Sequence, residues 1–501
     1  MNKIDIKKFA LSALILNFGV LLGRFSGFIR ELTVANNYGV SYQADLTIIA
    51  LTLPDILINI LVGGALSAAL IPLMTRHPEN ARKITFQASL ALLSLFLFFA
   101  FLLQPISNLV VTAIAPGLIR EVSLQAQEIV SLTFYILPVF VITGVLTSYL
   151  HSKEQFAVPS LGTLIFNSVV IAFLTYLDGV DYSLSMIITA VFCAGFARYL
   201  SQLIAVKPTF RFSGMLSPWL IDRTLLKKYI QAMLAGGAFF LFPVVTRSFS
   251  SYYGEGSIAS FSYAMRLIEF PLLISVTFIS VIFFPKLSKS FSRDRDKFES
   301  QLSVALHSIL VLGLFSTIVL TSITNRYVEI VFGIVLDSSL TNQILPLVRI
   351  GLLCLVFQGI ITVLTAALNA ANKPKIPMVL NFIVIILLIL IFNLKGSHAR
   401  ITDLMWYLVS AYIFLCSLYF YKCRQWIMGK LINRNLMLFY FNLIFFCGVI
   451  SYLGVNFISN SNSILFLVLY LIASLFTILT VSFLSYPLGR KIVTMRVRNN
   501  V

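Results

Sequence analysis

Long apolar stretches alternate with short polar connections along almost the whole chain. A run of about 20 apolar residues crosses about 30 Å of hydrocarbon as an α-helix, whereas an open strand there would leave its backbone groups without partners. The pattern therefore predicts an all-α polytopic membrane protein with about fourteen transmembrane helices. The predicted spans are residues 9–29, 44–72, 84–104, 127–150, 156–177, 182–206, 226–252, 259–285, 302–323, 342–370, 375–394, 403–422, 436–458 and 463–489.

An internal repeat relates two parts of the chain. The stretch Val145–Leu150 recurs 218 positions later as Val363–Leu368, and each copy is followed by a proline that precedes another span. The offset places spans 1 to 6 against spans 7 to 12 in the same orientation, which predicts two parallel six-helix lobes with a substrate site between them. We expect an N-lobe at 1–206, a C-lobe at 207–430, and spans 13 and 14 with a basic tail at 431–501.

Composition supports a membrane location and sets the orientation. With 59% hydrophobic and 11% charged residues, the chain has too little polar surface for a soluble globule. Of its 37 Lys and Arg residues, 27 lie in connections on one side of the predicted membrane and 4 on the other. The positive-inside rule then predicts that both termini are cytoplasmic. The basic residues form no stripe, which argues against nucleic acid despite the net charge of +18.

Residues typical of metal or catalytic chemistry are scattered. The five cysteines lie in or beside apolar stretches without C-x-x-C spacing, and the four histidines are dispersed. An enzyme acting on membrane lipids would need carboxylates or histidines gathered at a membrane face. We therefore expect no metal, no cofactor and no enzymatic activity.

Charged residues inside the predicted spans are the main candidates for function. The embedded arginines are Arg24, Arg30, Arg198, Arg247, Arg266 and Arg349. The embedded acids are Asp45, Asp55 and Glu269. An arginine at mid-membrane costs about 2.5 to 3.5 kcal/mol, so each needs a reason. Arg198, Arg247 and Arg349 lie near span ends, where the side chain is expected to snorkel to the interface. Arg266 and Glu269, at i and i+3, are spaced for an ion pair within one helix.

The arginines outnumber the acids, so the membrane interior is cationic on balance. Arg24 has Asp45 or Asp55 as a potential partner from the next span, but pairing every arginine would exhaust the acids. Guanidinium groups without acid partners in a cavity favour an anion, and their planar donor fork matches phosphate oxygens. The candidate substrate-binding set comprises Arg24, Arg30 and Arg266 with the acids Asp45, Asp55 and Glu269.

Three local motifs resemble one known family. They are Gly-Arg-Phe-Ser-Gly-Phe-Ile-Arg-Glu at 23–31, Leu-Pro-Asp at 53–55 continuing to Gly-Ala-Leu-Ser at 64–67, and Arg-Leu-Ile-Glu-Phe-Pro at 266–271. Together they closely resemble the MurJ/MviN family, the lipid II flippases of the multidrug/oligosaccharidyl-lipid/polysaccharide exporter superfamily. The resemblance implies a fourteen-helix fold with a central cationic cavity and a groove for the polyprenyl tail near spans 13 and 14.

The resemblance also implies a function. Family members move lipid II, a polyprenyl-diphosphate-linked peptidoglycan precursor, from the inner to the outer leaflet by alternating access for cell wall synthesis. Arginines at the positions of Arg24, Arg30 and Arg266 matter in the family, and the last two are associated with the diphosphate. The expected partners are the lipid-linked glycan, membrane lipids and cell wall synthesis proteins.

The chain departs from the family pattern at charged positions. Ile58 occupies a position where the family usually has arginine, and Gly63 occupies one where it usually has glutamate. Some members are thought to bind sodium through acids in spans 7 and 11, and these spans contain no acid here. These differences leave open a flippase of another polyprenyl-linked oligosaccharide, such as an exopolysaccharide or O-antigen unit, and a scaffold that has lost transport. A cation antiporter would favour cavity carboxylates, contrary to the cationic excess.

The predicted orientation can be tested with reporter fusions. Fusions after residues 80, 215 and 430 should report a cytoplasmic location, and those after 120, 335 and 398 an external one, because of the 27-to-4 distribution of loop cations. A majority in the reverse sense would contradict both the orientation and the family resemblance.

Overall fold

A computed structural model describes most of the chain. The described residues are 3–57, 65–176, 183–207, 216–221, 225, 229–230, 241–291, 294–333, 338–371, 373–395, 400–431, 445–446, 448–458 and 469–474. Regular structure over these residues is helical, which confirms the all-α prediction. Ile58, Gly63 and most of the predicted spans 13 and 14 lie outside the described residues.

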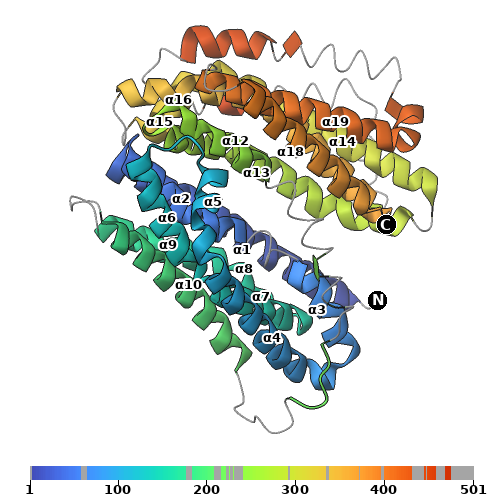
Figure 1. Ribbon diagram of the computed structural model, residues 1–501. Coiled ribbons are helices and arrows are strands. Elements are labelled where there is room, and N and C mark those ends of the chain that lie inside the picture. Colours follow the sequence, from blue (N-terminus) through green and yellow to red (C-terminus); the bar gives the residue numbers. More distant parts are fainter. Residues whose placement is uncertain are drawn as a thin grey trace. The chain divides into compact units, whose positions relative to one another are not determined.

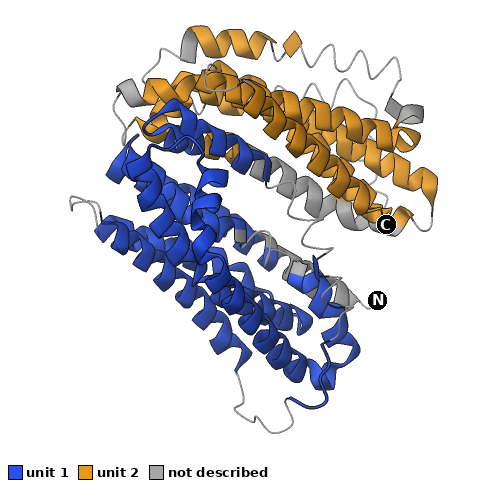
Figure 2. Cartoon of the chain, viewed as in Figure 1, with its two compact units in different colours: residues 1–263 blue, residues 264–501 orange. Residues whose placement is uncertain are grey.

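The chain divides into two compact units, residues 1–263 and 264–501 (Figure 2). The helices of the first unit (Figure 1) are α1 (Lys3–Tyr38), α2 (Tyr42–Leu57), α3 (Ala65–Arg76), α4 (Ala81–Leu102), α5 (Ser107–Ile114), α6 (Arg120–Phe134), α7 (Leu137–Ser152), α8 (Ala157–Ser160), α9 (Gly162–Tyr176), α10 (Leu184–Val206) and α12 (Leu241–Ser250). Helix α13 (Ser257–Phe291) begins in the first unit and continues in the second. The other helices of the second unit are α14 (Arg295–Ser322), α15 (Thr324–Phe332), α16 (Ser338–Gly351), α17 (Cys354–Ala370), α18 (Lys375–Lys395) and α19 (Ile401–Leu431).

Several helices are long and apolar enough to cross a membrane. In the described part of the chain five helices meet this criterion, or up to seven spans if each of two bent helix pairs counts as one. The protein is therefore a multi-pass membrane protein. The count of fourteen spans stays a prediction.

The internal repeat appears as two equivalent bent pairs. Helices α6 and α7 meet at 42° in the first unit, and α16 and α17 meet at 45° in the second. The repeated sequence lies in α7 in one copy and in α17 in the other. In the first pair Pro138, near the start of α7, has no N–H to continue the α6 hydrogen-bond ladder. The neighbours also correspond, because α7 packs on α4 and α10 as α17 packs on α14 and α19.

Glycines bring α1 against α8 and α9. Gly19, Gly23 and Gly27 recur every four residues and so share one face of α1. A Cβ atom on Gly23 would lie 2.9 Å from Cβ of Thr163, and one on Gly19 would overlap Ser160. Gly19, Gly23 and Gly27 lie against Ser160, Thr163 and Asn167, respectively, so the partners follow the same order along the chain. Helices α1 and α9 therefore run parallel, as expected for the first and fifth spans.

Glycines play the same part in the second unit. A Cβ atom on Gly313 of α14 would lie 3.2 Å from Cα of Val356, and one on Gly359 of α17 would lie 2.5 Å from Ile309. These glycines therefore allow α14 and α17 to pack closely.

A hydrogen bond joins α14 to a described part of predicted span 13. Near the end of α14, Ser322 donates a hydrogen bond of 2.9 Å to Ser451. This contact ties a described part of predicted span 13 to α14.

The α1–α9 contact predicts a stability difference between two glycine substitutions. Gly23→Ala should destabilise the protein by about 1 to 3 kcal/mol, because the added methyl group overpacks against Thr163. Gly448→Ala adds the same methyl group where nothing lies within 4 Å, and should leave stability unchanged or slightly raised. Thermal denaturation of the purified protein in detergent measures both; equal midpoints would contradict the close packing.

Candidate functional site

Arg30 lies at the centre of a buried polar cluster in the first unit. Its Nη2 atom is 2.8 Å from Oδ2 of Asp55, and Nη1 donates to Oδ1 of the same carboxylate at 3.4 Å. Nη1 also donates to Oδ1 of Asn167 at 2.9 Å, and Glu31 lies 3.8 Å from Nη2. Arg30 is 2% exposed, whereas the Asp55 side chain is 32% exposed. The expectation that candidate arginines lack acid partners is wrong for Arg30.

Asn167 of α9 orients this part of α1. Its Nδ2 group donates to the carbonyl oxygen of Gly23 and to the hydroxyl of Ser26, both at 3.0 Å, while its Oδ1 accepts from Arg30. Every contact depends on the close approach that the α1 glycines permit. Sequence reasoning missed Asn167; the available signal was a single amide in the otherwise apolar span 5, because buried polar groups need partners.

Asp45 binds the beginning of α13. Its two carboxylate oxygens accept hydrogen bonds from the backbone N–H groups of Ala259, at 2.7 Å, and Gly256, at 2.9 Å. Tyr263 on the same helix donates to the carbonyl oxygen of Gly39 at 2.9 Å. A buried carboxylate at a helix N-terminus satisfies orphan N–H groups and complements the helix dipole. Asp45 thus holds the first turns of α13 against the start of α2.

Arg266 and Glu269 lie on α13 in the second unit. Their side chains form the predicted i,i+3 ion pair, with 3.7 Å between Nη1 and Oε2. The two side chains are 29% and 35% exposed, so neither is sealed in a core. The Arg266 guanidinium is therefore accessible to a ligand.

The other embedded arginines differ in burial. Arg24 is exposed on α1, and Arg247 on α12 is half-buried. Arg349, expected to snorkel, is exposed and donates to Asn325 at 2.9 Å. Arg198, also expected to snorkel, is 6% exposed, so that expectation is wrong. Its position near a span end suggested an interface, but α10 packs it against α9 instead.

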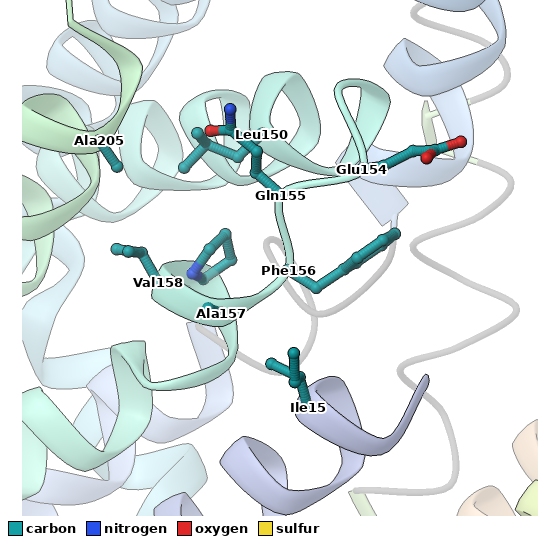
Figure 3. Close-up of a pocket in the computed structure, with 9 residues that line it drawn as sticks. Ile15, Leu150, Glu154, Gln155, Phe156, Ala157, Val158 and Ala205 are labelled. Carbon is teal, nitrogen blue, oxygen red and sulfur yellow. The ribbon is translucent and has the colours of Figure 1, made fainter. Parts of the chain in front are cut away.

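A separate cavity of about 320 Å³ lies at the other end of α1 (Figure 3). It is lined by Ile15, Leu150, Glu154, Gln155, Phe156, Ala157, Val158, Pro159 and Ala205. Ile15 precedes Arg30 by fifteen residues, or about 22 Å of helix. Among the described residues the lining is mainly apolar and includes none of the candidate arginines Arg24, Arg30 and Arg266. Within the described residues, no group of three or more His, Cys, Asp or Glu side chains is placed to hold a metal ion.

Comparison with solved structures shows a known fold. The chain resembles a multidrug resistance MATE family transporter of the MOP superfamily in its inward-facing conformation, with a TM-score of 0.60 and 12% identity over 83% of this chain and 94% of that one. The class that the fold defines is a polytopic helical membrane protein with two repeated bent helix pairs.

The family follows from the sequence. The family model described as lipid II flippase MurJ matches residues 34–486, and the chain belongs to this family. It is 25% identical over 381 residues to a protein of Buchnera aphidicola subsp. Acyrthosiphon pisum named probable lipid II flippase MurJ, covering 72% of each chain. A solved structure of lipid II flippase MurJ in an inward closed conformation matches with a TM-score of 0.78 and 20% identity, over 96% of this chain and 100% of that one.

The Asp45 contacts predict a large effect on stability. Asp45→Ala should destabilise the protein by about 1 to 3 kcal/mol, because two buried N–H groups of α13 lose their acceptor. Asp294 accepts from the N–H of Lys297 at the exposed start of α14, where water can replace it. Asp294→Ala is therefore the matched control and should cost less, as measured by thermal denaturation in detergent. A larger loss for Asp294→Ala would contradict the proposed anchoring of α13.

Proposed function

We propose that this protein is a lipid II flippase that moves the precursor from the inner to the outer leaflet of the bacterial cytoplasmic membrane. Membership of the MurJ family and the names of the curated relatives support this cargo over another polyprenyl-linked oligosaccharide. The observation that carries the proposal is Arg30, a buried guanidinium held by Asp55 and Asn167 on a span that also carries Arg24.

The diphosphate of lipid II is the group that these cations recognise. Arg24 and Arg30 on α1 and Arg266 on α13 supply donors that match phosphate oxygens and stay charged at any physiological pH. The acids beside them, Asp55 and Glu269, hold the arginine side chains in place before the head group arrives. Asp45 contributes indirectly by anchoring the start of the helix that carries Arg266.

Charge neutralisation supplies the driving interaction for alternating access. A bound ligand shifts an equilibrium between two conformations only by its different affinity for them. We infer that the diphosphate reduces repulsion between cations of the N-lobe (1–206) and the C-lobe (207–430), which favours closure and then outward opening. In this proposal spans 13 and 14, within residues 431–501, supply the groove for the polyprenyl tail, as the family resemblance implies.

The remaining features fit a transporter of the cytoplasmic membrane. Both termini are cytoplasmic in this account, because the loop cations lie overwhelmingly on one side. The protein carries out no covalent chemistry and uses no cofactor. Its partners are the lipid-linked substrate, surrounding membrane lipids and the cell wall synthesis proteins that use the product.

The cargo and the cation site can be tested together. Arg266→Ala should abolish the arrival of lipid II at the outer leaflet in cells depleted of the native protein, with protein level and topology near normal. Arg266→Lys should restore transport only in part, because a point charge lacks the bidentate fork. The leaflet distribution of lipid II is the measurement.

The control is Arg349→Ala, because Arg349 is exposed at a helix end and donates to the Asn325 amide oxygen. It should transport normally. Full activity of Arg266→Ala would remove the phosphate-binding mechanism. Equal loss in Arg266→Ala and Arg349→Ala would indicate a general folding defect instead.

A further inference from the structure

Arg198 on α10 is a buried cation that the proposed function has not used. It is 6% exposed, and its Nε and Nη1 atoms have no hydrogen-bond partner in the part of the chain that the structure describes. The adjacent Gln202 is fully buried, accepts a hydrogen bond of 2.8 Å from Thr147, and has an Nε2 group that is also without a partner. Burying a guanidinium with unfilled donors costs free energy. We therefore expect that another conformation of the protein provides Arg198 with a hydrogen-bond acceptor.

Helix α9 contacts both α1, which carries Arg30, and α10, which carries Arg198. A Cβ atom on Gly162, the first residue of α9, would lie 3.1 Å from Nε and 3.4 Å from Cζ of Arg198, so the guanidinium lies against this backbone. Asn167, which holds Arg30, is five residues further along the same helix, or about 7.5 Å. The two guanidinium groups therefore approach α9 from α1 and from α10.

Asp55 is the acid common to both cations. Helix α2, which carries it, contacts both α1 and α10. Its carboxylate binds Arg30 through two hydrogen bonds and also attracts Arg198 electrostatically. With its side chain 32% exposed, Asp55 is the least enclosed member of this group.

We propose that Asp55 is an exchangeable partner, bound to Arg30 in the substrate-free protein and transferred to Arg198 when a lipid diphosphate binds Arg30. The anionic head group repels the Asp55 carboxylate, and the unfilled Nε and Nη1 donors of Arg198 receive it. Arg198 is thus a positioning residue that frees Arg30 for substrate. This inference rests on the proposed function, since it takes lipid II as the anion.

The test measures the affinity of the purified full chain in detergent for purified lipid II, with phosphatidylethanolamine as the reference lipid. Arg198→Gln should weaken lipid II binding about tenfold, within the usual range of coupling between sites, because Asp55 then stays on Arg30. Arg198→Lys should weaken it less. Adding Asp55→Asn to Arg198→Gln should restore affinity to within about threefold of the wild type, a rescue that a purely structural role for Arg198 does not provide.

Two further variants make the test independent of whether Arg198→Gln folds. Asp55→Asn alone should bind lipid II more tightly than the wild type, because the head group then has no carboxylate to displace from Arg30. Adding Arg198→Lys should not change that affinity, and both variants can be measured even if Arg198→Gln fails to fold. Wild-type affinity in Arg198→Gln, or a loss that persists in the Asp55→Asn background, would overturn the exchange while leaving the flippase proposal intact. A wild-type protein that binds lipid II no better than phosphatidylethanolamine would overturn both.

Discussion

The close approach of α1 to α8 and α9 is the constraint on which the first unit depends. Side chains at Gly19 or Gly23 would push the helices apart, and Asn167 would then no longer reach the Gly23 carbonyl or the Arg30 guanidinium. Small residues allow such contacts in membranes, where the lipid is as apolar as leucine and hydrophobic burial cannot drive helix association. The same face of α1 therefore determines both its packing against α9 and the position of the Arg30 guanidinium.

The low dielectric of the membrane interior explains the charge arrangement. A buried arginine is costly without acceptors around it, and Arg30 obtains them from Asp55 on α2 and Asn167 on α9. These interactions fix the guanidinium and also limit it, because a head group has to compete with Asp55. In the second unit Arg266 pairs with Glu269 on its own helix at 3.7 Å, and both side chains are partly exposed.

Sequence reasoning recovered the features that depend on local spacing. The apolar pattern predicted the helices, the offset of 218 predicted the equivalence of α7 and α17, and the i,i+3 spacing predicted the Arg266–Glu269 pair. Sequence reasoning did not predict the contacts between segments that are far apart in the chain. Asp45 binds N–H groups more than 200 residues away, and the burial of Arg198 depends on Gly162 of a neighbouring helix. No periodicity within one helix specifies such partners.

The central claim is that this chain itself transfers lipid II across a bilayer. Purified protein reconstituted into liposomes, with lipid II supplied in one leaflet, tests it most directly. The account predicts protein-dependent appearance of lipid II in the opposite leaflet. Translocation no faster than in protein-free liposomes, with the reconstituted protein folded, would contradict it.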